Sequence, residues 1–424
     1  MSPRGGRVRL VALLLAGTTT VAGCSWLEDD PAAVPAREQR PAQPERPGLL
    51  EDADRLDAAV GDLLDRRATL LRRGDVDGVV AQTVDDGEAR RAQRRYAVNL
   101  SRLPVGVLRY ESPPEVAVDG EDVRVRVRQV LQLSRFDAGP VRSEHELVLS
   151  PGRRDRLRVV SEAPVSDDPS TGGAQPWDLR PIGTLRQDGV LGVFDVGSAE
   201  FAPEVVSSAV AAAADVRDAV PYRWTRPVVV YAPSDLVLLD AISGLPGGVA
   251  DRLEGVSFPV RSSEDGPVHA ERVVLNPSML EADPAERDRL LRHELTHVAL
   301  AARDELVPRW LAEGLAEWVS VQPLPVADRL ISAAAVREAR AGIDDLPSDE
   351  EFNDGPRSSA NYDIAWQVCE GIAFTYGERA PWMLLDAMIR RPRTDPDVLV
   401  RRVLGTTGPR LASAAADRIL AQYG

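Results

Sequence analysis

The stretch from His293 to His297 reads His-Glu-Leu-Thr-His, and it constrains the chain more than any other feature. On a helix, residues four apart lie one turn above each other on the same face. Two imidazoles placed in this way can bind one divalent metal ion. Glu294 is turned about 100° from their shared face, toward a water molecule on the metal. The chain has only 4 histidines, so a helix that presents this pair is a specific prediction.

A catalytic metal needs a third protein ligand and one open coordination position. Glu313 follows His297 after residues 298–312, which leaves room for the first helix to end, for a turn near residues 303–305, and for a second helix. Pro308 is suited to begin that helix, because the N–H that proline lacks would have no partner there. A second helix that crosses the first would bring a carboxylate to the metal. Glu317, one turn further on, is the alternative third ligand.

Together, H-E-L-T-H and the downstream W-L-A-E-G-L-A-E-W resemble the gluzincin zinc metallopeptidases, and the short spacer resembles their compact, peptidase MA-like members. The resemblance implies Zn²⁺ as the cofactor, with His293, His297 and Glu313 as its ligands and Glu294 as the general base. Glu317 would then be a carboxylate that orients a ligand imidazole. A solvated charge on the helix surface is the other interpretation of Glu317.

The same resemblance implies two further roles. A tyrosine on a later helix reaches back to the metal in related families, and Tyr362 is the candidate for donating a hydrogen bond to the oxyanion. The strand before the metal-binding helix is a sheet edge that pairs with extended substrate in gluzincins. This places Val273, Val274, Leu275 and Asn276 at a substrate-binding edge. The chain has no G-x-M-E-N segment, which binds the free amine of substrates in the large aminopeptidases, so an endopeptidase is favoured.

The first residues predict export from the cytoplasm. Three arginines precede an apolar run at residues 10–16, and small residues follow, so residues 1–23 have the pattern of a signal peptide. The ending Val-Ala-Gly-Cys resembles the lipobox of bacterial lipoproteins, which implies a lipid on Cys24 and anchoring to the outer face of the cell membrane. Residues 24–48 are rich in proline and predict an extended tether. With Cys24 lipidated, Cys369 has no disulfide partner.

Length and charge limit the remaining possibilities. A chain of 424 residues predicts two or three domains. The net charge of −15 argues against a nucleic-acid partner.

Residues 49–164 predict a separate α+β domain. Apolar residues recur at helical spacing from Leu56 to Leu71. A second helix is expected at 88–100, followed by strands at 105–110, 116–118, 123–128, 141–149 and 156–160. Helices followed by an antiparallel meander resemble the NTF2-like cone fold, which can bind a ligand or mediate contacts. His145 has no second histidine beside it that would complete a metal pair, and we interpret it as an ordinary strand residue.

Residues 165–176 are rich in glycine, proline and aspartate and predict a linker. Residues 177–424 then predict a mixed α/β, zincin-like domain whose C-terminal half is mainly helical. The expected function is that of a membrane-anchored zinc metallopeptidase which acts on peptides or proteins of the cell envelope. Two alternatives stay open: a catalytically idle zinc-binding scaffold, and an envelope lipoprotein that binds ligands through its NTF2-like domain.

Overall fold

The computed structural model describes residues 48–424, apart from residues 154–155, 225–226, 246–248, 264–265 and 354. Residues 47–424 form one compact unit. The chain is 52% helix and 20% strand, with one antiparallel and one mixed sheet, which confirms the predicted α+β class. The predicted signal peptide, the tether and Cys24 lie outside the described residues.

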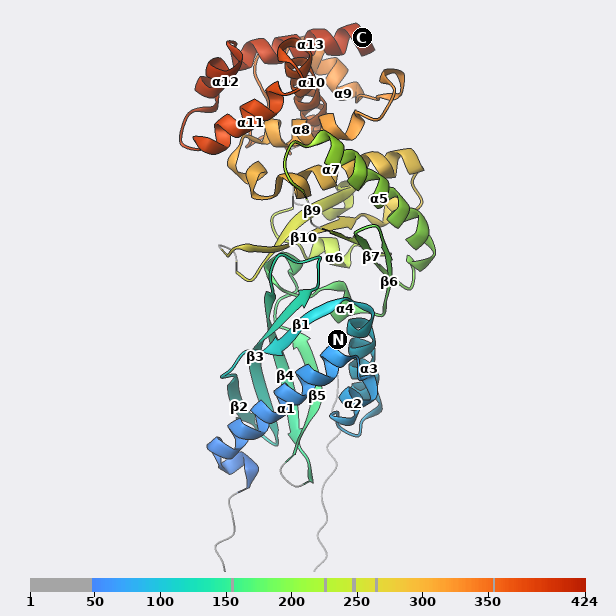
Figure 1. The fold of residues 1–424 in the computed structure, drawn as a ribbon, viewed down its shortest axis with the longest axis vertical. Coiled ribbons are helices and arrows are strands. Elements are labelled where there is room, and N and C mark those ends of the chain that lie inside the picture. The colour runs from blue at the N-terminus through green and yellow to red at the C-terminus, as the bar shows by residue number, and fades with distance from the viewer. Residues whose placement is uncertain (1–47, 154–155, 225–226, 246–248, 264–265, 354) are drawn as a thin grey trace, which may run out of the picture. The chain divides into compact units, whose positions relative to one another are not determined.

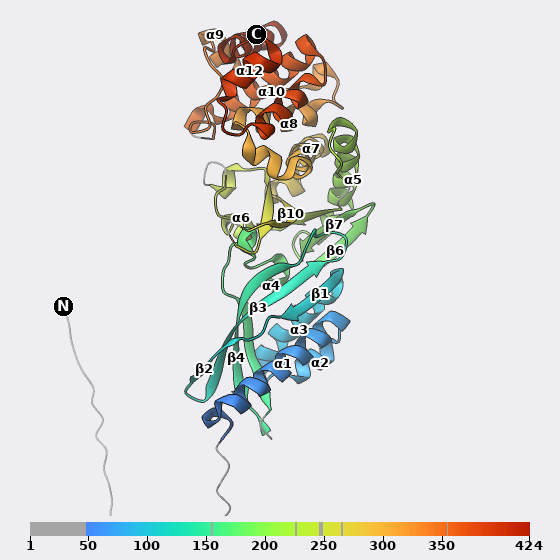
Figure 2. The ribbon, with the colours of Figure 1, turned by 60° about the vertical axis from the view of Figure 1, so that its left-hand side comes forward.

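The first part of the unit packs three helices against an antiparallel sheet (Figures 1 and 2). The strand order is β1-β3-β4-β5, and β2 pairs with the other end of β3. The elements are α1 (Ala53–Arg73), α2 (Val76–Ala81), α3 (Gly87–Arg102), β1 (Val105–Tyr110), β2 (Glu115–Asp119), β3 (Asp122–Leu133), β4 (Val141–Pro151) and β5 (Leu157–Pro164).

Local sequence explains these elements. The side chain of Asp52 accepts a hydrogen bond from the first turn of α1, and Gly74 ends that helix in the left-handed conformation, which glycine adopts without strain. In β3, valines at 123, 125 and 127 are buried while the arginines between them are exposed. A strand directs alternate side chains to opposite faces, so β3 buries one face against the helices.

The second part begins with a mixed five-stranded sheet in the order β6-β7-β8-β10-β9. Its three central strands are parallel, and both outer strands, β6 and β9, run antiparallel to their neighbours. The elements are α4 (Pro176–Leu179), β6 (Ile182–Gln187), β7 (Val190–Asp195), α5 (Ala202–Ala219), β8 (Val228–Ala232), α6 (Val237–Asp240), β9 (Gly255–Arg261) and β10 (Val268–Leu275).

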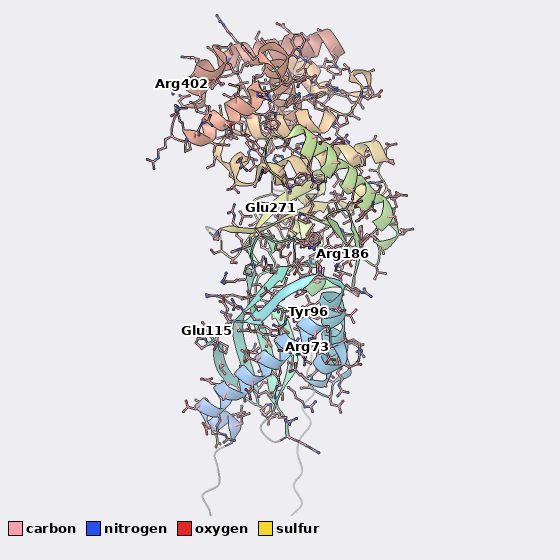
Figure 3. All side chains as sticks on the ribbon, in the orientation of Figure 1. Arg73, Tyr96, Glu115, Arg186, Glu271 and Arg402 are labelled. Atoms are coloured by element: carbon pink, nitrogen blue, oxygen red, sulfur yellow. The ribbon has the colours of Figure 1, made fainter. Side chains whose placement is uncertain are left out.

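Both faces of this sheet are apolar. Val228, Val230 and Val273 belong to the hydrophobic cluster that includes α5 and α7, whereas Val229 and Val274 belong to the cluster that extends into the first sheet. Successive strand residues therefore pack against different layers, and side chains fill the space on both sides (Figure 3). In the amino-acid sequence, a strand that is buried on both faces is a continuous run of apolar residues such as valine and leucine.

The remaining elements are helical. They are α7 (Pro284–Leu300), α8 (Arg309–Val321), α9 (Ala333–Ala341), α10 (Ser358–Tyr376), α11 (Ala380–Arg390), α12 (Pro396–Leu404) and α13 (Gly408–Tyr423). The predicted helical C-terminal half is thus present. Within the described part of the chain, no helix combines the length and apolar character required to span a membrane.

A buried ion pair joins the two sheets. Arg272 on β10 donates to Asp137, which lies in the loop after β3, at 2.6 Å, and to the hydroxyl of Tyr231 at 2.9 Å. Both charged side chains are almost fully buried. The hydroxyl of Tyr231 also donates to Gln175 at 2.9 Å, so part of the predicted linker is packed into the same network.

We predict that Asp137→Ala lowers the free energy of unfolding by about 3–5 kcal/mol, because it leaves the guanidinium of Arg272 buried without its counter-ion. Urea denaturation measures the loss. Asp119→Ala is the control, since it removes one partner of an exposed ion pair with Arg124 and should leave the unfolding midpoint almost unchanged. Equal midpoints for the two variants would contradict the structural role of the buried pair.

Candidate metal centre

Helix α7 places His293 and His297 on one face. It begins at Pro284, and the side chain of Asp283 accepts from the N–H of Ala285 at 2.8 Å, as a helix N-cap does. Inside the helix, Arg292 donates to the backbone carbonyl of Ser320 on α8 at 2.7 Å. This contact fixes the rotation of α7 against the helix that carries the third candidate ligand.

Helix α8 can pack closely against α10 because position 314 is glycine. A Cβ on Gly314 would lie 2.5 Å from the backbone oxygen of Ala365 on α10. Any side chain there would push α8 away from α10. The neighbouring Glu313 faces the two histidines instead, and it is nearly buried. Glycine is therefore required at position 314, directly after Glu313, so that α8 can pack against α10.

Three side chains converge at one point. His293 Nε2 and His297 Nε2 lie 3.2 Å apart, and Glu313 Oε2 lies 3.4 Å from the first and 3.2 Å from the second. Zinc–nitrogen and zinc–oxygen bonds of about 2.05 Å in a tetrahedron require ligand atoms about 3.3 Å apart. The three separations match the edges of such a tetrahedron. Among the described residues, this is the group whose ligand atoms could hold a metal ion.

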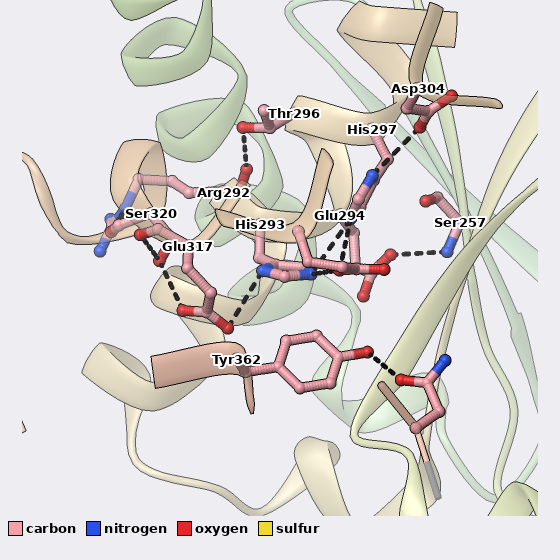
Figure 4. A network of polar contacts seen from close by, with 12 residues as sticks. Ser257, Arg292, His293, Glu294, Thr296, His297, Asp304, Glu317, Ser320 and Tyr362 are labelled. Carbon is pink, nitrogen blue, oxygen red and sulfur yellow. Dashed lines mark hydrogen bonds and ion pairs between the residues drawn. The ribbon is translucent and has the colours of Figure 1, made fainter. Parts of the chain in front are cut away.

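Two further carboxylates contact the outer nitrogens of the imidazoles (Figure 4). Glu317 Oε1 lies 3.2 Å from His293 Nδ1, and its other oxygen accepts from Arg289 at 2.7 Å. Asp304 Oδ2 lies 3.1 Å from His297 Nδ1. Carboxylates in this position fix the ring orientation and leave Nε2 free for a metal.

The structure thus brings Glu317 to the position that the sequence analysis proposed for it, and Glu313 to the other side of the ring. Sequence reasoning missed Asp304, although it placed a turn at 303–305. In the structure these residues belong to a 3₁₀ helix at Ala301–Leu306, whose fold determines where Asp304 is directed.

The charges of the site depend on one another. Burial alone would lower the pKa of His293, but the carboxylates of Glu317 and Glu313 raise it to about 9. Burial likewise opposes the charged form of His297, but Glu313 and Asp304 hold its pKa well above the usual range. In turn, the two histidines hold the pKa of Glu313 far below its ordinary value, although burial would raise it. His293 and Arg289 lower the pKa of Glu317 to about 2, again against the effect of burial. The pocket favours positive charge, supplied by protons or by a metal.

Glu294 and Tyr362 lie beside this centre. Glu294 is buried, and its Oε2 accepts from the backbone N–H of Ser257 on β9 at 2.6 Å. The ring of Tyr362 lies 6.2 Å from the ring of His293, and its hydroxyl donates to Asn353 at 3.1 Å. Burial and then the charge of Glu313 raise the pKa of Tyr362 well above its usual value, so it is a neutral donor.

A cleft of about 360 Å³ opens over the centre. It is lined by residues of β9, β10 and α8 together with the segment around Asp304. Ser257, Pro259 and Glu271 form the wall on the sheet side. A cleft of this size can hold several residues of an extended chain or a small ligand.

The predicted substrate-binding edge was wrong. Val273 and Val274 belong to β10, which pairs with β8 on one side and with β9 on the other, so its backbone groups are already used. Leu275 also pairs with β9, and Asn276 follows the strand, where it donates to the carbonyl of Leu253. The edge strand on this side of the sheet is β9.

A sequence signal for β9 existed. Proline cannot donate to a neighbouring strand and is confined to edge strands, strand beginnings and bulges. Pro259 lies inside β9, opposite Glu271 on β10. An apolar run that begins at a glycine and contains a proline is the sequence pattern that indicates such an edge strand.

The comparisons with known proteins add little to this geometry. No protein-family model matches the chain, and no curated protein matches it. One solved structure in the comparison is that of Rv3472, titled a function unknown protein from Mycobacterium tuberculosis. It shares 20% identity over 25% of this chain and 73% of its own, with a TM-score of 0.22. This similarity carries no argument about fold or function.

We predict that the metal-free protein loses stability as the pH rises from about 6.5 to about 9. A raised histidine pKa means that the folded state gains stability from the proton, fully present below the unfolded pKa and lost as the pH passes the folded one. One pKa unit corresponds to about 1.4 kcal/mol, so the loss should exceed about 1 kcal/mol. Urea denaturation of chelator-treated protein at several pH values measures it. His293→Gln should flatten the curve, and an equally steep curve in that variant would contradict the assignment.

Proposed function

We propose that the chain is a zinc-dependent metallopeptidase, and the observation that carries the proposal is the triangle of ligand atoms. His293, His297 and Glu313 present two nitrogens and one oxygen at the mutual distances of a tetrahedral zinc site. Three protein ligands leave a fourth position open, as a catalytic site requires. The resemblance of the two motifs to gluzincins supports the same ligands.

Zinc bound there would act as a Lewis acid toward a substrate carbonyl and would lower the pKa of a coordinated water. Glu294 would take the proton of the attacking water and pass it to the leaving amine. The N–H of Ser257 holds one oxygen of Glu294, so the carboxylate is oriented before substrate arrives. Tyr362 would donate a hydrogen bond to the oxyanion once substrate displaces its hydrogen bond to Asn353.

The edge strand β9 supports a peptide as the substrate class. Its free side lies at the cleft, because Ser257 and Pro259 line the cleft while β10 occupies the other side of the strand. A peptide that pairs with β9 would extend the sheet and pass over the metal centre. We propose β9 in place of residues 273–276 as the strand that binds substrate.

We propose that residues 49–164 are an NTF2-like cone and residues 177–424 a zincin-like domain. Support for the first comes from the long helix α1, which packs on a sheet of order β1-β3-β4-β5. The mixed sheet with an antiparallel edge strand, followed by α7 and α8, supports the second.

Glu294→Gln should retain zinc and lose peptide hydrolysis by at least about a hundredfold, since a positioned general base contributes about 10²–10⁴ in rate. Glutamine can still accept from Ser257 but cannot take the proton. Metal content by mass spectrometry and cleavage of a peptide library, both on one preparation, test this. Full activity in the variant would exclude the mechanism, and loss of zinc would make Glu294 a structural ligand.

Ligand variants are the controls for that experiment. His293→Ala and His297→Ala should abolish zinc binding, and Glu313→Ala should weaken it more than Glu317→Ala. The opposite order for the two glutamates would assign Glu317 as the third ligand. Zinc near one per chain without hydrolysis of any peptide would favour the idle scaffold.

We also propose that a lipid on Cys24 anchors the protein to the bacterial cell membrane, on its extracytoplasmic side. The lipobox-like ending of residues 21–24 supports this. Cys24→Ser should move the protein from the membrane to the soluble fraction, because none of the described helices could replace the lipid as an anchor. Immunoblots of fractionated cells measure the distribution. A variant that stays in the membrane pellet would mean that the signal peptide is uncleaved or that another anchor exists.

A further inference from the structure

A second group of reactive side chains lies inside the first sheet, far along the chain from the metal ligands. Ser143 and His145 are two residues apart on β4, so both side chains point to the same face. The Oγ of Ser143 lies 3.1 Å from Nε2 of His145. On the other side of the ring, Nδ1 lies 3.5 Å from Oε1 of Glu162 on β5. A hydroxyl, an imidazole and a carboxylate thus follow one another in order.

Glu162 is held as an anion. Arg67 on α1, which is fully buried, donates to Glu162 Oε2 at 2.6 Å, and the hydroxyl of Tyr110 donates to Oε1 at 2.6 Å. Burial would raise the pKa of Glu162, but Arg67, His145 and Tyr110 together lower it to about 2. An ionised carboxylate can only accept hydrogen bonds.

The carboxylate of Glu162 lies on the Nδ1 side of the imidazole, within ion-pair distance of it. With the ring proton on Nδ1, toward this anion, Nε2 would be free to accept the hydroxyl proton of Ser143. His145 is 2% exposed, and Ser143 is the hydrogen-bond partner of its Nε2. A nucleophile, a base within 3.2 Å, and a group that orients the base are the elements of an activated serine.

The hydroxyl faces a cavity. Ser143 and His145 line a space of about 30 Å³ together with Gln129, Trp177, Asp178 and Arg272. Room for one water requires about 10–15 Å³ by this measure, so the cavity accepts a group of about two or three heavy atoms. Gln129 and Arg272 also line this space, where their donors are held by hydrogen bonds to Tyr96 and to Tyr231 and Asp137. Tyr96 on α3, labelled in Figure 3, receives a hydrogen bond from Gln129 and so helps to position that amide.

We propose that Ser143, His145 and Glu162 form a second catalytic site, which accepts small acyl groups such as acetyl from esters. His145 takes the proton of Ser143 as Oγ bonds to the carbonyl carbon. The carbon–oxygen bond of the ester breaks, and the alcohol leaves with that proton. Water, deprotonated by His145, then releases the acid and restores the serine. The cavity is lined by none of the candidate metal ligands, so this activity is separate from that proposed for the metal centre.

The test uses the full chain with Glu294→Gln and a chelator, which removes any hydrolysis by the metal centre. Methanesulfonyl fluoride is among the smallest sulfonyl fluorides, and it leaves a stable sulfonyl ester on an activated serine, while fluoride and the serine proton depart. Trypsin cleaves after arginine and releases the peptide of residues 143–153, so mass spectrometry locates the label. We expect labelling of Ser143, and hydrolysis of p-nitrophenyl acetate that Ser143→Ala abolishes.

Ser150→Ala is the matched control, because that serine lies on the same strand with its side chain on the opposite face; the variant should hydrolyse the ester like the parent. His145→Gln should slow labelling at least about a hundredfold. Absence of label on Ser143, or labelling unchanged by His145→Gln, would overturn the proposal. Should His145→Gln fail to fold, the comparison of Ser143→Ala with Ser150→Ala decides alone: equal ester hydrolysis by those two variants would also overturn it.

Discussion

The metal centre depends on compensation between buried charges. His293, His297, Glu313 and Glu317 are all nearly withdrawn from water, and each alone would be driven toward its neutral form. They remain charged because each carboxylate lies within about 3.5 Å of an imidazole. Such a cluster tolerates the loss of one member poorly. It also favours exchange of the two imidazole protons for a metal, since the same carboxylates stabilise either form of positive charge.

The mixed sheet determines which strand lies beside the cluster. Strand β10 is buried on both faces and paired on both sides, so it serves as the support for β9 rather than as a binding edge. β9 then carries Ser257 to Glu294 and exposes its free side at the cleft. Arg272 connects the same support strand to Asp137 in the first part of the chain. Glu271 lines the cleft over the metal centre, and the adjacent Arg272 lines the cavity beside Ser143 and His145. The two spaces are therefore separated by strand β10.

Several features could be predicted from the sequence because they depend on local spacing. The ligand pair on α7, the N-cap of that helix, the alternation in β3 and the buried run in β10 all follow from the periods of helix and strand. The α+β class follows from the same patterns. The inner position of β10 in the sheet did not follow, because a run of buried residues shows that a strand is covered and leaves its pairing partners open. His145 looked like an ordinary strand residue because its partners Ser143 and Glu162 become a chain of contacts only when β4 and β5 pair.

By itself, the sequence determined which residues could bind a metal and which one could act as a base, since four-residue spacing on a helix is a property of the chain alone. The choice between Glu313 and Glu317 was left to the tertiary structure. Both lie on α8, one turn apart, and both approach His293, but at opposite nitrogens of its ring. Which nitrogen each one meets depends on how α8 crosses α7. That crossing is set by the contact of Gly314 with Ala365 on α10 and by the bond from Arg292 to Ser320, both between segments distant in sequence.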